Sequence, residues 1–192
     1  MALCKNQIKF IRDNKKAIKL FVETGFLRGD GVKIALDLDF ERIISIEINK
    51  DYINKSKSMF TKEITEGKVT IVHGNSAEKL REVLETIDEA AVFYLDAHAH
   101  GHGCPLIDEL NAIKNHYIKG HVIVVDDVWF IENSVNNSDR APWANNLTFD
   151  RFMGIVQNIF DDTKVEKIEY GQSAYSDGGN NYALAVLNNN KS

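Results

Sequence analysis

Short apolar runs alternate with amphipathic stretches along most of the chain. Five of the runs have the length and the β-branched content of strands, at 20–24, 42–48, 68–73, 90–96 and 120–127. The stretches between them carry apolar residues at helical spacing, at 32–38, 51–60, 77–86 and 105–117. Strands separated by helices have to cross over the sheet, so the pattern predicts parallel pairing.

The two ends of the chain depart from this alternation. Residues 1–19 place Ile8, Ile11 and Ile18 among Lys, Arg and Asp, which predicts a leading amphipathic helix over 8–18. After the fifth strand we expect a polar loop over 132–146, a helix over 149–160, and two late strands over 165–170 and 182–187. No full helix separates these late strands, which favours an antiparallel pair.

Together these elements predict an α/β fold with a doubly wound, mostly parallel seven-stranded sheet and an antiparallel edge. A length of 192 residues suits one domain, so we expect a single domain over 1–192 with a flexible tail at 188–192. A hydrophobic fraction of 44% and a charged fraction of 27% are typical of a soluble globular protein.

Charge and cysteine content narrow the class of partner. A net charge of -5 disfavours a nucleic-acid partner, which would need a basic face. Cys4 and Cys104 are too few for a disulfide framework, and no apolar stretch is long enough to span a membrane. No signal-like segment stands at the N-terminus, and we expect a cytoplasmic protein.

Glycines and acidic residues follow the predicted strands at their carboxyl ends. In open α/β sheets, ligands bind beyond these ends. The residues concerned are 23–31 after the first strand, Glu47 after the second, Asn75 after the third, Asp96 after the fourth, and Asp126 and Asp127 after the fifth. This placement predicts one site along the carboxyl edge of the sheet.

The loop after the first strand contains Gly25, Gly29 and Gly31, which allow a sharp turn and a close approach of a ligand to the backbone. The spacing differs from the G-x-G-x-x-G pattern of dinucleotide sites, which disfavours a nicotinamide cofactor. Glu47 stands where a carboxylate can accept hydrogen bonds from both hydroxyls of a ribose. The loop and Glu47 thus indicate a site for a nucleoside-containing cofactor.

These motifs resemble those of the class I S-adenosylmethionine (SAM)-dependent methyltransferases over nearly the whole chain. That family has (E/D)-x-G-x-G-x-G in its first loop, and residues 23–31 read ETGFLRGDG, a variant that departs at Phe26 and Leu27. The resemblance implies a Rossmann-like methyltransferase fold and SAM as cofactor. It implies cofactor contacts from Glu23, Thr24, Gly25, Gly29, Gly31, Glu47, Asn75, Ser76 and Asp96.

Three histidines at alternate positions follow Asp96, namely His98, His100 and His102. No cysteine or further histidine completes a closed zinc site with them. Asp96 instead joins Asp126 and Asp127 at neighbouring strand ends, and oxygen ligands of this kind suit Mg or Mn.

A second resemblance concerns these three carboxylates. Metal-dependent sugar and catechol-type O-methyltransferases have an Asp after the fourth strand and an Asp pair after the fifth, which implies a divalent metal (Mg or Mn) on Asp96, Asp126 and Asp127. The alternative is that the Asp pair caps the segment that follows it.

The resulting hypothesis is a SAM-dependent O-methyltransferase that acts on a hydroxyl of a sugar, a glycan or another small diol, assisted by the metal. His98 is the preferred general base because its ordinary pKa is near neutral, and Asp96 is the second catalytic candidate. Two alternatives are a metal-dependent hydrolase that uses the Asp and His residues, and a SAM-binding domain without catalytic activity.

Overall fold

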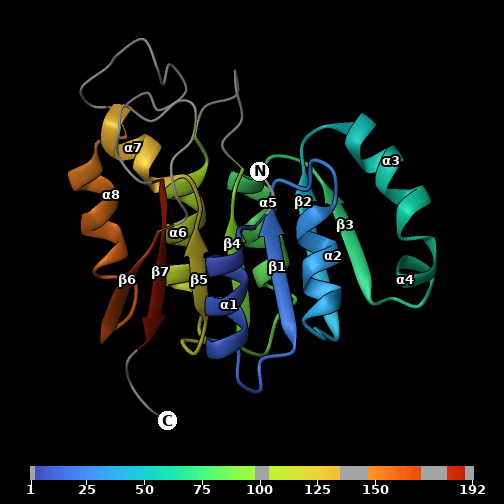
Figure 1. Cartoon of the computed structure of the whole chain (residues 1–192), viewed down its shortest axis with the longest axis horizontal. Coiled ribbons are helices and arrows are strands. Elements are labelled where there is room, and N and C mark those ends of the chain that lie inside the picture. The colour runs from blue at the N-terminus through green and yellow to red at the C-terminus, as the bar shows by residue number, and fades with distance from the viewer. Residues whose placement is uncertain (1–2, 98–103, 135–146, 170–180, 189–192) are drawn as a thin grey trace.

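The structure is a computed structural model that describes residues 3–97, 104–134, 147–169 and 181–188. Seven strands form one sheet in the order β3-β2-β1-β4-β5-β7-β6 (Figure 1). Their bounds are β1 Leu20–Thr24, β2 Arg42–Glu47, β3 Val69–His73, β4 Ala91–Leu95, β5 Val122–Val125, β6 Thr163–Glu169 and β7 Tyr182–Asn188.

Strands β1 to β5 pair in parallel, and β7 pairs antiparallel with both β5 and β6. The mostly parallel sheet with an antiparallel edge is therefore confirmed. The chain moves outward from β1 through β2 to β3 and then returns to pair β4 with the other side of β1. This reversal opens a crevice beyond the carboxyl ends of β1 and β4, where α/β proteins of this type bind ligands.

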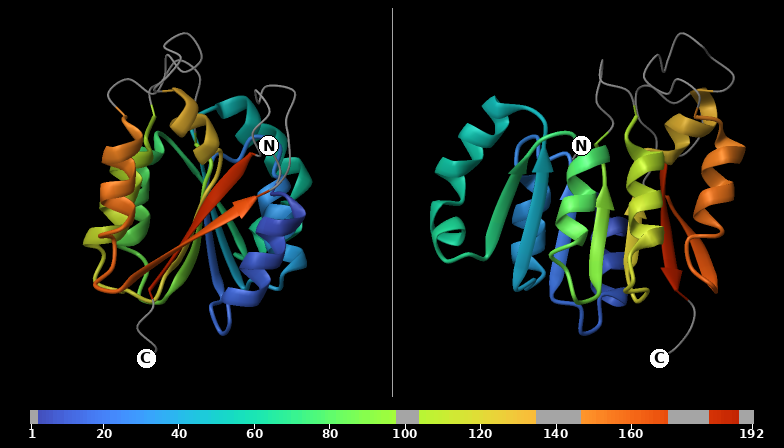
Figure 2. Two further views of the ribbon diagram at one scale, coloured as in Figure 1. Left: turned by 60° about the vertical axis from the view of Figure 1, so that its left-hand side comes forward. Right: turned by 180° about the vertical axis from the view of Figure 1, so that it is seen from behind.

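Helices cover both faces of the sheet, as a doubly wound fold requires (Figure 2). Helices α1 (Lys5–Asn14) and α2 (Asp30–Asp37) lie on one face, and α5 (Ser76–Leu84), α6 (Leu106–Asn115) and α8 (Phe149–Val156) lie on the other. Alternate strand residues feed two separate cores, one on each face. Phe21 packs towards the first set of helices and Val22 towards the second.

Two short helices were not expected from the pattern. Helix α7 (Val128–Ser134) follows β5, so the predicted loop is wrong for residues 132–134. The side chains of Val128 and Ile131 are both fully buried, and this three-residue spacing holds the helix against the core. Helix α4 (Thr61–Thr65) directly follows α3 (Lys50–Met59) beside the β3 edge of the sheet (Figure 1).

The leading helix is also shifted towards the N-terminus from its predicted range. It begins at Lys5 because Cys4 and Gln7 form a reciprocal capping box, and it ends at Asn14, before Ile18. Among the described helices, none is long and apolar enough to cross a bilayer.

Candidate functional site

The carboxyl ends of four strands stand at one level along the sheet. Gly25 N donates to Ile46 O at 2.9 Å, Asp96 N to Thr24 O at 3.2 Å, and Asp126 N to Leu95 O at 3.0 Å. These bonds continue the strand ladders by one residue each. The candidate site residues therefore follow the order Glu47, Gly25, Asp96, Asp126 across β2, β1, β4 and β5.

The loop between β1 and α2 turns through left-handed backbone. Gly25 and Gly29 have φ values of 90° and 75°, and Leu27, which is not a glycine, has a φ of 46°. A β-carbon at Gly25 would lie 2.8 Å from Asp96 O, so the loop passes directly over the end of β4. This packing requires glycine at position 25, as the sequence pattern predicted.

Glu23 lies beneath this loop and is buried, with 1% of its surface exposed. Its Oε1 accepts a hydrogen bond from Ser45 Oγ at 2.7 Å, and a β-carbon at Gly31 would lie 1.8 Å from its Oε2. Burial raises the pKa of Glu23 to about 8, although the Ser45 hydroxyl opposes the shift. The carboxyl group thus sets the distance between β1 and the first turn of α2.

Thr24 is fully buried at the end of β1, and its Oγ1 has no hydrogen-bond partner among the described residues. A buried hydroxyl without a partner costs about 1–3 kcal/mol. This hydroxyl therefore lies unpaired, within the described residues, at the strand end where a polar ligand is expected.

Glu47 ties the loop to the end of β2. Its Oε2 accepts a hydrogen bond from Leu27 N at 2.9 Å, and its Oε1 accepts one from Asn49 N at 2.7 Å. A carboxylate offers about four lone-pair positions, and these bonds use two of them. Both oxygens can therefore still accept hydrogen bonds from hydroxyl groups of a ligand.

The turn after β3 lies beside Glu47, because Gly74 N donates to Glu47 O at 2.9 Å. Asn75 is the N-cap of α5, and its Oδ1 accepts a hydrogen bond from Ala77 N at 3.1 Å. Ser76 is the first residue of that helix and is buried. The structure gives Asn75 a capping role and places both residues next to Glu47.

Asp126 is the most enclosed of the three carboxylates that were predicted to hold a metal, with 3% of its surface exposed. Its Oδ1 accepts hydrogen bonds from Gln7 Nε2 and Asp127 N, both at 2.8 Å, and its Oδ2 accepts one from the Tyr94 hydroxyl. Burial, followed by the charges of Asp96 and Asp126, raises the pKa of Tyr94 well above its ordinary value. The phenol therefore remains a donor.

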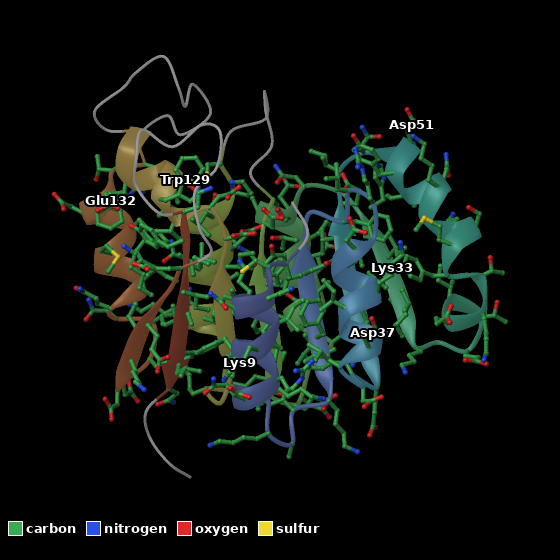
Figure 3. The ribbon with its side chains drawn as sticks, viewed as in Figure 1. Lys9, Lys33, Asp37, Asp51, Trp129 and Glu132 are labelled. Atoms are coloured by element: carbon green, nitrogen blue, oxygen red, sulfur yellow. The ribbon has the colours of Figure 1, made fainter. Side chains whose placement is uncertain are left out.

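Asp96 and Asp127 lie on either side of this group. Asp96 Oδ2 is 3.5 Å from the Tyr94 hydroxyl, and Asp127 Oδ1 accepts a hydrogen bond from Trp129 Nε1 at 3.2 Å. Asp127 has a left-handed φ of 50°. Trp129 is in α7 at the carboxyl end of the sheet (Figure 3).

The histidine part of the prediction falls on residues that the structure does not describe. His98, His100 and His102 all lie outside the described ranges. Within the described residues, no group of three or more His, Cys, Asp or Glu side chains is arranged to hold a metal ion.

Sequence reasoning missed Gln7, Leu27 and Tyr94. Tyr94 could have been found, because it is two residues before Asp96 and side chains two apart in a strand share a face. Gln7 carried no such signal, since its contact with Asp126 spans 119 positions.

No profile of a known protein family matches this sequence, and no curated protein matches it. Several solved structures are similar to it in fold. The O-methyltransferase TomG from Streptomyces achromogenes, involved in tomaymycin synthesis and solved with SAM, is 18% identical, with a TM-score of 0.67 over 97% of this chain and 81% of that one. An O-methyltransferase from Bacillus cereus, solved with S-adenosylhomocysteine (SAH), is 16% identical, with a TM-score of 0.66 over 96% and 82%.

A third similar structure is the SAH-bound methyltransferase PaMTH1 from Podospora anserina. It is 17% identical, with a TM-score of 0.58 over 97% of this chain and 78% of that one. Identities this low establish a common architecture, and a fold by itself does not define an activity. The chain thus has the fold of the class I SAM-dependent methyltransferases.

Proposed function

We propose that this protein is a SAM-dependent O-methyltransferase that methylates a hydroxyl of a sugar, a glycan residue or another small diol. One observation carries the proposal. Glu47 holds the glycine loop through Leu27 N and keeps lone pairs for two further hydroxyl donors, at the strand end where a nucleoside ribose would lie.

The residues of this edge fit SAM in two further respects. Left-handed backbone at Gly25 lets the loop pass over the end of β4, at the switch point between β1 and β4 where ligands of such sheets bind. Ser76 and the Asn75 cap lie beside Glu47, on the side where an adenine attached to the ribose would extend.

Methyl transfer to a hydroxyl forms a carbon–oxygen bond, breaks the carbon–sulfur bond of the SAM sulfonium, and releases the hydroxyl proton. Alignment of the oxygen with the methyl carbon supplies much of the rate. In the proposal, Asp96 stands between the cofactor loop and Asp127, where its carboxylate can orient an acceptor hydroxyl. His98 remains the proposed general base.

The metal that the resemblance implies does not fit the described carboxylates as one three-ligand centre. Asp126 is nearly covered and accepts three hydrogen bonds from protein donors, and Asp127 accepts one from the Trp129 indole. We therefore derive no step through a metal. Methyl transfer that is abolished by EDTA and restored by Mg²⁺ or Mn²⁺ would mean that the Asp126 group rearranges around an ion.

Titration calorimetry with SAH tests the cofactor assignment. Glu47→Ala should weaken binding by about 10- to 100-fold, because the variant loses charge-assisted hydrogen bonds worth about 1.5–3 kcal/mol. Glu41→Ala is the matched control, since Glu41 is an exposed glutamate just before the other end of β2 and pairs with Lys19. It should bind SAH as the wild type does.

Binding of SAH by the wild type and Glu41→Ala, with loss in Glu47→Ala, would then justify assays of methyl transfer from SAM to methyl glycosides and catechol. A wild type that binds neither SAH nor SAM would refute the methyltransferase proposal. Metal-dependent turnover of phosphoesters or amides without SAM would instead favour the hydrolase.

A further inference from the structure

The first turn of α1 fixes the orientation of a buried amide. Gln7 Oε1 accepts a hydrogen bond from Cys4 N at 2.7 Å, as part of the capping box that begins the helix. The amide nitrogen must then face the other way, and Gln7 Nε2 donates to Asp126 Oδ1 at 2.8 Å. Gln7 is 1% exposed, so this amide bridges the helix start and the end of β5 inside the protein.

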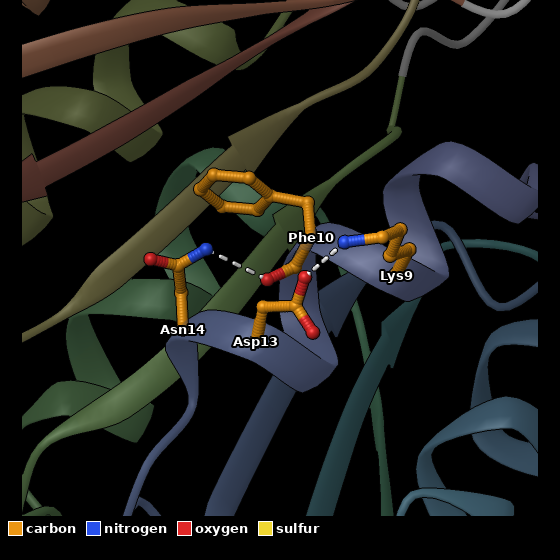
Figure 4. Close-up of polar contacts among 4 residues, drawn as sticks. All are labelled: Lys9, Phe10, Asp13 and Asn14. Atoms are coloured by element: carbon orange, nitrogen blue, oxygen red, sulfur yellow. Dashed lines mark hydrogen bonds and ion pairs between the residues drawn. The ribbon is translucent and has the colours of Figure 1, made fainter.

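The neighbouring polar side chains of α1 behave differently. Lys9 pairs with Asp13 on the helix itself, and Asn14 Nδ2 donates to Phe10 O at 2.9 Å (Figure 4). Asn6 Nδ2 donates to Glu169 O at 2.6 Å, on the edge strand β6. Gln7 is set apart from these residues because it bonds to a carboxylate of the candidate site.

Asp126 is held from two further directions. The Tyr94 hydroxyl reaches it from β4, and Asp127 N reaches it from the next residue of its own chain. Hydrogen bonds to an ionised acceptor are about twice as strong as neutral ones, so three of them fix both carboxylate oxygens. Asp127 follows in left-handed backbone and meets Trp129, so the position of Asp126 determines where this segment lies.

We propose that Gln7 and Tyr94 are positioning residues that hold Asp126, and through it Asp127, at the acceptor end of the site. The first turn of α1 is then part of the site, although it is more than a hundred residues away in sequence. The role in acceptor placement rests on the proposed methyltransferase function. The contact itself can be tested without an acceptor.

Gln7→Glu separates this role from simple helix capping. Glutamate at this position of a capping box still accepts the hydrogen bond from Cys4 N, so a purely capping role predicts an unchanged melting temperature. The proposal predicts a fall of about 5–10 °C, because a second carboxylate would replace the donor that faces Asp126. The melting temperature of Gln7→Met, which lacks both polar groups, should fall by less than that of Gln7→Glu.

A paired substitution tests the direct contact. Asn at position 126 can donate its amide to Glu at position 7, although Asp127 N then loses its acceptor, so Gln7→Glu combined with Asp126→Asn should melt at a higher temperature than Gln7→Glu alone. Asn6→Ala is the matched control on the same turn, and it should leave the site unchanged because Asn6 bonds to β6.

Trp129 reports whether the site itself moves. The chain has two tryptophans, and in a Trp143→Phe background Trp129 is the single emitter. Gln7→Glu and Tyr94→Phe should each shift its fluorescence maximum, whereas Asn6→Ala should not. Calorimetry with SAH on Gln7→Glu and Asn6→Ala should show cofactor affinity within about twofold of the wild type, because Glu47 lies on β2, separated from Asp126 by strands β1 and β4.

Two outcomes would overturn the inference. If Gln7→Glu melts like the wild type, Gln7 only caps α1. If it melts lower while Trp129 emission stays unchanged, Gln7 fastens the helix without positioning the site. Failure of the wild type to bind SAH would remove the proposed function, and the melting and fluorescence results would still decide the contact.

Discussion

The two ends of the parallel sheet satisfy their polar groups in opposite ways. At the amino end, Ala91 N donates to His121 Nδ1 at 3.1 Å, which leaves the His121 proton on Nε2. That nitrogen lies 2.9 Å from His116 Nδ1, and His116 Nε2 lies 3.1 Å from Ile87 O. Each donor meets one acceptor, so the two histidines complete a chain of hydrogen bonds that needs no ligand.

At the carboxyl end, carboxylates from several strands are gathered at one edge of the sheet. Glu23, Glu47, Asp96 and Asp126 lie along four neighbouring strands of the edge, and the protein supplies donors from backbone, Ser45, Tyr94 and Gln7. Left-handed backbone does not distinguish the two ends, because Leu27 and Asp127 lie at the carboxyl end while Lys16 and Asp39 precede β1 and β2 at the amino end.

The contrast teaches how one sheet can carry both stability and function. The amino end is built from groups that satisfy one another, and the carboxyl end keeps acceptors that a ligand's hydroxyls can use. Substitutions at the two ends should therefore differ in what they damage.

Gly31→Ala should produce the largest effect at the carboxyl end. The new β-carbon would lie 1.8 Å from Glu23 Oε2, so either α2 or the buried carboxyl must move. We expect unfolding free energy to fall by more than about 3 kcal/mol in urea denaturation, which is the upper range for overpacking, and SAH affinity to fall with it.

Gly154→Ala is the control for Gly31→Ala. Gly154 is inside α8, and a β-carbon added there would meet no atom within 4 Å, so alanine should stabilise the protein by about 0.5–1 kcal/mol. A Gly31→Ala protein as stable as the wild type would show that Glu23 is not held against α2.

The sequence predicted most of this architecture and only part of the site. The strands were predictable because their apolar runs are buried on both faces, as in β1 and β4, and the glycine at 25 was predictable because the chain must turn there. The positions of Glu47 and Asp96 followed from parallel pairing, which brings all carboxyl ends to one edge.

What could not be predicted depends on how a helix sits against a strand. The apolar pattern of α1 shows which face is buried, and it gives no register between Gln7 and Asp126. Helix α7 could not be separated from the strand before it, because its apolar part, Val128 to Ile131, is a single turn that follows β5 closely. The histidine chain was missed for the same reason as Gln7, since Ile87, Ala91 and His116 come from different segments.

His121→Phe should give the second largest effect, at the amino end. Burial lowers the pKa of His121 to about 3, against an ordinary value of 6.5. Between these values the unfolded chain binds more protons at this site, so the contribution of His121 to the unfolding free energy should rise with pH from 3 to 6.5. At pH 7 the unfolding free energy of the variant should be lower by about 2–3 kcal/mol, because His116 Nδ1 and Ala91 N lose their partners. The variant should also lack most of this pH dependence.

His73→Gln is the control for this slope. His73 is exposed at the end of β3, and its replacement should leave the pH dependence that His121 produces in place. A His121→Phe protein with the full wild-type slope would contradict a buried, neutral His121. SAH binding by His121→Phe at pH 7 should match that of the wild type, which separates the two ends of the sheet.

Glu23→Gln should cause the smallest loss of stability at pH 7, and it should change the pH dependence with the opposite sign. The pKa of Glu23 is raised to about 8 from an ordinary 4.5, so between these values the folded protein binds more protons than the unfolded chain. The contribution of Glu23 to the unfolding free energy should therefore fall as pH rises from 4.5 to 8, and the neutral amide removes this pH dependence. Between pH 5 and pH 8, the difference in unfolding free energy should move in favour of the variant by about 3–4 kcal/mol. The matched control is Glu85→Gln, at an exposed position that follows α5, and its difference in unfolding free energy from the wild type should be the same at pH 5 and pH 8.

If the difference in unfolding free energy between Glu23→Gln and the wild type is also the same at both pH values, the buried carboxyl is already ionised. Gly31 would then pack against a charge that the N-terminus of α2 stabilises.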